Sequence, residues 1–129
     1  LARAAGHEAV IVSQFCFEAE PILAWLQRLR AQGIDAPVRI GLAGPASVAT
    51  LAKFAVRCGI GHSIRALARG HSSLARLLVE LGPDQVVADL AAALPADAAI
   101  DGLHFFTFGG IARTAAWLAA HSTDARPPR

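Results

Sequence analysis

Residues 9–17 read AVIVSQFCF, a nearly continuous apolar run that is rich in β-branched and aromatic side chains. Such a run is typical of a strand that is buried on both faces, as the strands of parallel sheets are. The residues that follow, 18–31, place apolar side chains at the spacing of one helix face: Ile22, Trp25, Leu26 and Leu29. The sequence therefore predicts a strand followed by an amphipathic helix, the beginning of a βαβ unit.

The same alternation continues along the chain. The further predicted elements, in order, are a strand over 38–42, a helix capped by Ser47 and ending near Cys58, helical residues over 65–81 in two pieces, a helix opened by Pro83, a strand over 102–108, and a helix after Gly110. Strands that are separated by helices imply right-handed crossovers and a parallel sheet.

Three parallel strands alone would leave two long apolar edges exposed. A three-unit fragment of a (β/α)8 TIM barrel explains this arrangement, because such barrels run to roughly 250 residues. A flavodoxin-like or Rossmann sheet is the alternative, disfavoured by the small number of strands and by the absence of a GxGxxG motif. We therefore expect about three parallel strands with flanking helices over residues 1–122, and a polar tail over 123–129.

The composition fits a folded domain. Of the 129 residues, 54% are hydrophobic and 17% are charged, which excludes a disordered, highly charged linker. The net charge of +2 arises from a small excess of Arg and gives no support to nucleic-acid binding, and no apolar run approaches the roughly 18 residues of a membrane span. Two distant cysteines favour a reducing compartment, the cytoplasm. Because the chain begins at Leu1 and contains no Met, we expect a piece of a longer protein.

Gln14 is the most informative polar residue. Strand alternation would place it on one face with Val10 and Val12, at the C-terminal end of the strand, where α/β folds carry their sites. An amide offers two donors and an acceptor, which suits the edge of a heterocyclic ligand. The alternative is a glutamine that is hydrogen-bonded to loop backbone at the strand end.

The other polar residues carry weaker signals. Glu18 and Glu20 could form an acid/base pair, but acids in a first helical turn are favoured by the helix dipole alone. The Cys16 thiol has no identifiable base partner, and the turn over 41–45 lacks the Lys-Ser/Thr of a phosphate loop. We expect no metal site, since the remaining candidates lack ligand spacing: Cys58, His62 and His71. The arginines at 65, 69 and 76 suit a solvated face, and the phenylalanines suit a core in which one or two could stack on a planar ligand.

Five segments, in this order, resemble methylenetetrahydrofolate reductase: 12–18 (VSQFCFE), 33–35 (GID), 40–42 (IGL) followed by Pro45, 53–55 (KFA) and 103–108 (LHFFTF). The resemblance runs over nearly the whole chain. It implies the C-terminal portion of a (β/α)8 barrel whose FAD, supplied with electrons by NADH or NADPH, reduces a methylene group on tetrahydrofolate to a methyl group in one-carbon metabolism.

The resemblance also implies site residues. The family's glutamine that bonds the pterin matches Gln14, and the phenylalanine near the folate matches Phe54. A second folate-side Gln of the family falls near Thr50, and an Arg that holds the folate tail falls near Gly110, so two polar groups are replaced. The family's catalytic Glu and most FAD contacts lie in the first half of the barrel, so we expect no catalytic residue here and no turnover by these residues alone.

The partners implied are a folate substrate and either the remainder of the barrel or a second copy of the chain. Two other functions stay open. One is a non-redox pterin- or folate-binding module, or an accessory subunit of a methyl-transfer system. The other is a structural half-barrel that pairs with itself or with another chain through its open edges.

Overall fold

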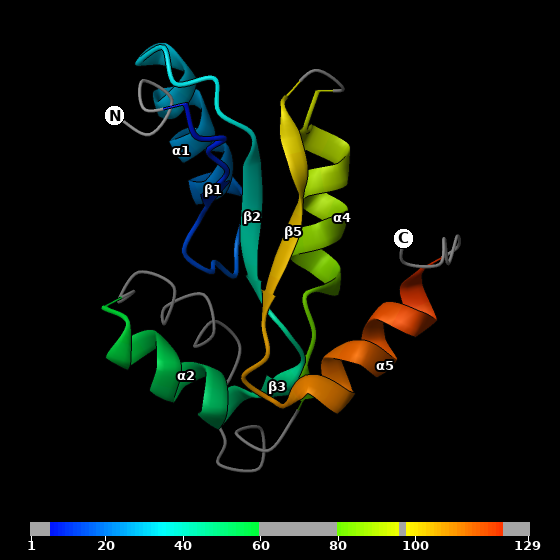
Figure 1. Cartoon of the computed structure of the whole chain (residues 1–129). Coiled ribbons are helices and arrows are strands. Elements are labelled where there is room, and N and C mark those ends of the chain that lie inside the picture. Colours follow the sequence, from blue (N-terminus) through cyan, green and yellow to red (C-terminus); the bar gives the residue numbers. More distant parts are fainter. Residues whose placement is uncertain (1–5, 60–79, 96–97, 123–129) are drawn as a thin grey trace. The chain divides into compact units, whose positions relative to one another are not determined.

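The computed structural model describes residues 6–59, 80–95 and 98–122. Its elements are β1 (Ile11–Val12), α1 (Ala19–Ala31), β2 (Val38–Ala43), β3 (Ala46–Ser47), α2 (Val48–Arg57), β4 (Glu80–Leu81), α4 (Asp84–Ala93), β5 (Ile100–Phe106) and α5 (Ile111–His121) (Figure 1). The chain divides into two compact units, which we describe separately. Unit 1 comprises Leu1–Leu42 and Asp84–Phe106, and unit 2 comprises Ala43–Pro83 and Thr107–Arg129.

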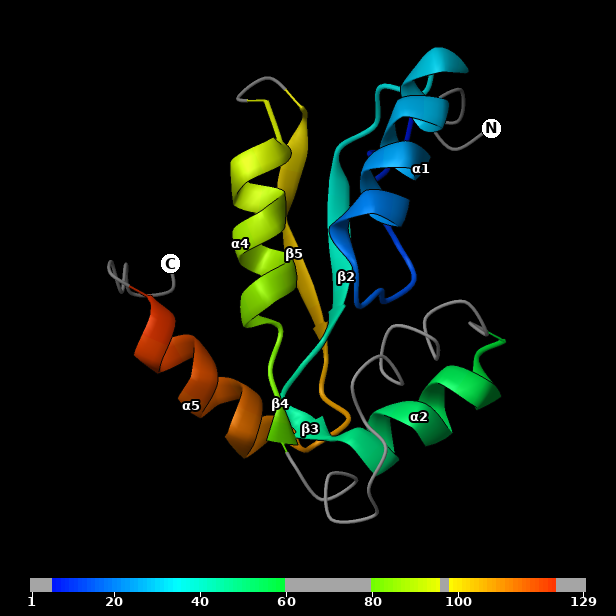
Figure 2. The same cartoon turned by 180° about the vertical axis from the view of Figure 1, so that it is seen from behind.

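Unit 1 is built on a parallel sheet with the strand order β1-β2-β5. Helices α1 and α4 both lie on one face of this sheet, as the two opposite views show (Figures 1 and 2). Their buried side chains meet those of β2 in one apolar core: Ile22, Leu26, Val38, Ile40, Leu42, Val86 and Leu90. The predicted mixed α/β fold with parallel strands is confirmed at this level.

The opposite face of the sheet, which we call the bare face, is covered by no helix among the described residues of unit 1. Val12 and Arg39 are paired across β1 and β2 and therefore point to the same side. Arg39 Nε lies 2.6 Å from Asp101 Oδ2 on β5, so an ion pair crosses from strand to strand. The side chains of Val10 and Val12 are 48% and 47% exposed. The bare face is thus an apolar surface crossed by one ion pair.

The first strand is much shorter than the predicted run over 9–17. Only Ile11–Val12 form β1, and an isolated bridge between Cys16 and Leu42 follows. Val12 is paired with Arg39 and Cys16 with Leu42. The first chain segment takes four steps between these pairs and β2 takes three, so one extra residue lies between Val12 and Cys16. This is a β-bulge, which breaks the simple alternation assumed for the whole run.

The third predicted strand is shifted. It spans Ile100–Phe106 in place of 102–108. Ile100 and Phe105 both pack against the core although they lie five residues apart, so the alternation is broken once between them. Gly102 has a φ of 151° in this interval, a conformation that favours glycine.

In unit 2 one segment differs in type from the prediction. Glu80–Leu81, predicted at the end of a helix, form β4 and pair antiparallel with β3, Ala46 with Leu81 and Ser47 with Glu80. The pair Gly82-Pro83 cannot continue a helix, and α4 then begins at Asp84, as the proline predicted. The rest of the helical prediction over 65–81, with the arginines at 65, 69 and 76, lies outside the described residues, as does the polar tail.

The helices of unit 2 begin where the sequence predicted. Ser47 caps α2, and its hydroxyl accepts a hydrogen bond from Thr50 N at 3.3 Å. Gly110 precedes α5, and a Cβ at the neighbouring Gly109 would overlap with the Pro45 carbonyl oxygen. Within the described residues no helix combines the length and the apolar character that crossing a bilayer requires.

Candidate functional site

Gln14 lies inside the bulge, and its side chain is exposed. Its Oε1 accepts a hydrogen bond from the Phe15 backbone N–H at 3.1 Å. Because an N–H can only donate, this contact fixes the amide oxygen toward the backbone and leaves the NH2 group on the other side. Among the described residues no acceptor bonds that NH2 group. The alternative interpretation of Gln14, a bond to nearby backbone, therefore describes its oxygen but not its nitrogen.

Ser13 and Gly41 form the base of the bulge. The Ser13 hydroxyl accepts a hydrogen bond from Gly41 N at 2.8 Å and donates one to the Gln14 carbonyl oxygen at 3.0 Å. A Cβ on Gly41 would overlap with the Ser13 carbonyl oxygen and lie 3.0 Å from the Gln14 carbonyl. Gly41, where the sequence predicts the strand over 38–42 to meet the turn over 41–45, therefore lies inside β2, and its close approach is to the chain's own backbone.

Phe15 anchors the other side of Gln14. Its side chain is fully buried, with ring centroids 5.7 Å from Phe17 and 5.4 Å from Phe106. Phe105 packs on the core. The predicted core role of these phenylalanines is confirmed for Phe15 and Phe105. Exposed Gln14 therefore lies between Ser13, whose hydroxyl is hydrogen-bonded to backbone, and buried Phe15.

A cavity of about 330 Å³ lies beside Gln14, with mostly apolar walls: Val12, Ser13, Gln14, Cys16, Pro21, Ile22 and Trp25. Its volume falls at the lower end of small-molecule sites. Burial and, to a smaller extent, the Glu18 carboxylate raise the pKa of the Cys16 thiol, so this thiol stays protonated at neutral pH. Gln14 is the amide side chain among the lining residues, and Cys16 offers the cavity no nucleophile.

Phe54 belongs to unit 2, so it is described apart from Gln14. It lies on α2, half-buried, and is not among the buried residues of the helix. Its ring stacks on that of Phe108, with centroids 4.2 Å apart and planes inclined by 19°. Phe54 thus lies beside the buried side of α2, which is formed by Val48, Leu51 and Ala55.

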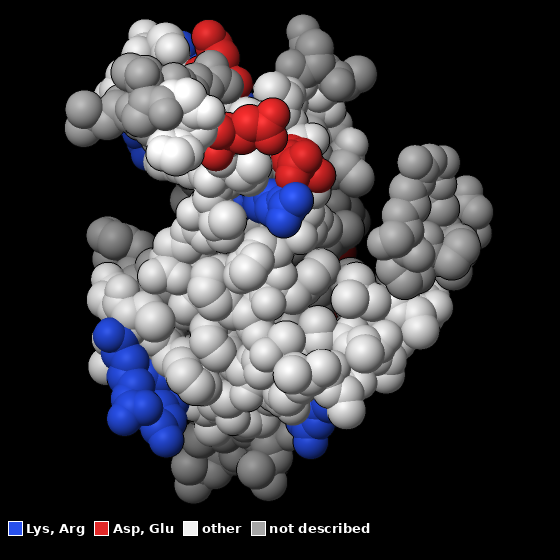
Figure 3. Space-filling view, viewed as in Figure 1, with Lys and Arg blue, Asp and Glu red and all other residues white. Residues whose placement is uncertain are grey.

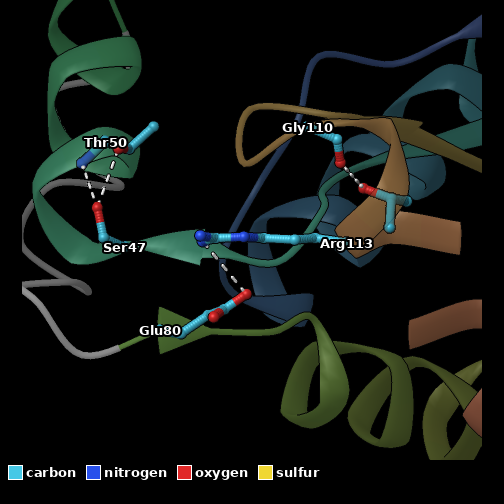
Figure 4. Close-up of polar contacts among 6 residues, drawn as sticks. Ser47, Thr50, Glu80, Gly110 and Arg113 are labelled. Atoms are coloured by element: carbon cyan, nitrogen blue, oxygen red, sulfur yellow. Dashed lines mark hydrogen bonds and ion pairs between the residues drawn. The ribbon is translucent and has the colours of Figure 1, made fainter. Parts of the chain in front are cut away.

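Thr50 and Gly110, the two positions at which the chain differs from the family it was compared with, lie at helix starts (Figure 4). Thr50 donates its backbone N–H to the Ser47 hydroxyl, which itself bonds the Thr50 Oγ1 at 2.9 Å, so the side chain of Thr50 takes part in the cap. Gly110, with a φ of 101°, accepts a hydrogen bond from the buried Thr114 hydroxyl through its carbonyl oxygen.

Two ion pairs were missed by reading the sequence. Arg113, in the first turn of α5, lies 3.6 Å from Glu80 Oε1 (Figure 4). Arg39 pairs with Asp101 on the bare face, and Figure 3 shows acidic and basic side chains meeting over the sheet of unit 1. The signal for Arg39 was present, because it alternates with Val38, Ile40 and Leu42 and so must point away from their core.

The remaining candidates are structural or untested. Glu18 is the N-cap residue of α1 and Glu20 lies in its first turn, which agrees with acids placed by the helix dipole. No group of three or more potential metal ligands occurs within the described ranges, while His62 and His71 lie outside them. No model of a known protein family matches the chain.

Proposed function

We propose that the chain is the C-terminal, folate-side part of a (β/α)8 barrel resembling a flavin-dependent methylenetetrahydrofolate reductase, in the cytoplasm. The observation that carries this proposal is the Gln14 NH2 group, exposed at the end of a parallel strand and bonded by no acceptor in the described part of the chain. Acceptor atoms line the edge of a pterin ring, and two amide donors can hold such an edge. The five ordered sequence segments supply the choice of ligand.

The bare face supports the barrel. Parallel sheets are normally covered on both faces, yet helices cover one face here. In a closed barrel the other face is filled by side chains from the remaining strands, which would bury Val10 and Val12. Both edge strands, β1 and β5, would then find neighbours in the remainder of the barrel or in a second copy.

In this proposal the chain's residues bind and orient the substrate. In unit 1, Gln14 donates hydrogen bonds to the pterin. In unit 2, Phe54, which the resemblance assigns to the folate, is stacked on Phe108. FAD, with NADH or NADPH as donor, supplies the hydride chemistry when bound, and the resemblance assigns most of its contacts to the missing half of the barrel. The lining of the cavity beside Gln14 combines apolar side chains with one amide, which suits a planar heterocycle such as a pterin.

The test uses the full-length gene product that contains these residues. We expect it to purify with bound flavin, visible by absorbance, and to oxidise NADH or NADPH when methylenetetrahydrofolate is added. A colourless protein that also fails to take up added FAD would contradict the enzyme function.

A non-redox folate-binding module, or an accessory subunit of a methyl-transfer system, is the second candidate. It is favoured by the two replaced positions, where Thr50 is engaged in a helix cap and Gly110 has no side chain. Titration of the same protein with tetrahydrofolate separates the two functions. Binding by a protein that takes up no flavin would favour the module.

A structural half-barrel is the third candidate, and the half-exposed Val10 and Val12 on the bare face favour it. Light scattering across a range of protein concentrations tests it. Growth of the particle mass with concentration would support pairing through the open edges, and a monomer at every concentration would count against it.

A further inference from the structure

The bulge between β1 and β2 sets the direction of the Gln14 side chain. An extra residue in one strand re-aims the side chain next to it, and such bulges occur often beside binding sites. Here the extra residue falls between Val12, which is paired with Arg39, and Cys16, which is bridged to Leu42. Gln14 lies in the middle of this interval.

The Ser13 hydroxyl closes the bulge. Where a regular ladder would offer Gly41 N a backbone carbonyl, Ser13 Oγ accepts that hydrogen bond at 2.8 Å. The same hydroxyl donates to the Gln14 carbonyl oxygen at 3.0 Å, so it ties the peptide after Gln14 to β2. The donor and the acceptor of one hydroxyl are thus both engaged by backbone groups, one on each strand.

The site accommodates this arrangement only with glycine at position 41, because a Cβ there would overlap with the Ser13 carbonyl oxygen. On the far side, buried Phe15 fixes the next residue, and its N–H holds the Gln14 amide oxygen at 3.1 Å. The Gln14 amide therefore has its oxygen turned to the backbone and its NH2 group turned outward because of the peptide geometry that Ser13 holds.

We propose that Ser13 is a positioning residue, whose hydroxyl bridges Gly41 and Gln14 so that the Gln14 NH2 group faces a ligand with a hydrogen-bond acceptor. The ligand part of this inference rests on the proposed folate function, whereas the bridging part does not. Ser13 offers the ligand no hydrogen-bond donor, since its single hydroxyl proton is given to the Gln14 carbonyl oxygen.

The first experiment needs no ligand. In NMR spectra of the 15N-labelled chain, Ser13→Ala is expected to shift the Gln14 side-chain NH2 and Phe15 N–H signals and to speed hydrogen exchange at Gly41 N–H. Ser13→Thr keeps the hydroxyl and is expected to restore both. Ser47→Ala, which removes a hydroxyl from the cap of α2, is the matched control and should leave these signals unchanged.

The second experiment measures tetrahydrofolate affinity of the full-length protein. We expect Ser13→Ala to weaken binding by about threefold to tenfold, the worth of one neutral hydrogen bond, and to add nothing when Gln14 is already Ala. A purely structural role would give additive losses in the double variant.

Unchanged Gln14 and Phe15 signals in Ser13→Ala, or additive losses of affinity, would overturn the proposal. Failure of the wild-type protein to bind tetrahydrofolate would defeat the folate function alone, and the ligand-free spectra would still decide the role of Ser13. Should Ser13→Ala not fold, Ser13→Cys, which replaces the hydroxyl by a weaker hydrogen-bonding thiol, is expected to shift the same signals, and unshifted signals would contradict the bridge.

Discussion

The two faces of the sheet in unit 1 differ in burial and in charge. On the covered face Val38, Ile40 and Leu42 are fully buried beneath α1 and α4. On the bare face, half-exposed Val12 is paired with Arg39, which forms an ion pair with Asp101. Alternation over Val38, Arg39 and Ile40 points Arg39 away from the core, whereas the next residue on its side of β2, Gly41, is buried. In the proposed barrel, the bare face is the surface that the remaining strands would cover.

The largest expected effect comes from comparing one deletion on each face. Ile40→Ala removes a fully buried side chain from the core and is expected to lower the free energy of unfolding by about 2–5 kcal/mol. Val12→Ala, at a side chain 47% exposed, is expected to cost less than about 1 kcal/mol. Urea denaturation of both variants measures the difference. Equal losses would mean that the bare face is buried in solution.

The next effect concerns the contact between the bulge and β2. Gly41→Ala is expected to lower the free energy of unfolding by about 1–3 kcal/mol, because its Cβ would overlap with backbone of Ser13. Gly33→Ala is the control, since its Cβ would meet nothing within 4 Å and its φ of 72° costs only about 1 kcal/mol. If Gly41→Ala were no more destabilising than this control in urea denaturation, the close approach would be wrong.

The ion pair on the bare face should contribute less. Its side chains are 52% and 37% exposed, so water and salt screen the attraction. Arg39→Gln and Asp101→Asn are each expected to change the free energy of unfolding by under about 1 kcal/mol, and by less at 1 M salt. A loss that is larger and independent of salt would show that the pair is buried, as it would be inside a closed barrel.

The smallest effect is confined to alkaline pH. The pKa of Cys16 is raised in the folded state, so the unfolded chain loses its thiol proton first as the pH increases. Stability due to Cys16 is therefore complete below the ordinary thiol pKa of 9.0 and is lost as the pH rises toward the folded-state value. Urea midpoints from pH 7 to 10 should fall less in Cys16→Ala than in the wild type. Parallel curves would contradict the shift.

Sequence patterns predicted the covered face better than the site. The helical spacing of Ile22 and Leu26 and the run at 38–42 placed the core correctly, because burial follows periodicity. The bulge was not predicted from the sequence, because the spacing of apolar residues does not show that the Ser13 hydroxyl replaces a backbone acceptor. Nor does it show that Gly41 lacks room for a Cβ. The position of Gln14 at a strand end was predictable, whereas the orientation of its amide depends on that local exception.

The most direct test of the folate function is the affinity of the full-length protein for tetrahydrofolate, measured by calorimetry for the wild type and two glutamine variants. Gln14→Ala removes the proposed pterin donors and should raise Kd by about threefold to tenfold. Gln27→Ala, on the exposed side of α1, should leave Kd unchanged. Equal affinities for the wild type and Gln14→Ala would contradict the role of Gln14 in binding the ligand.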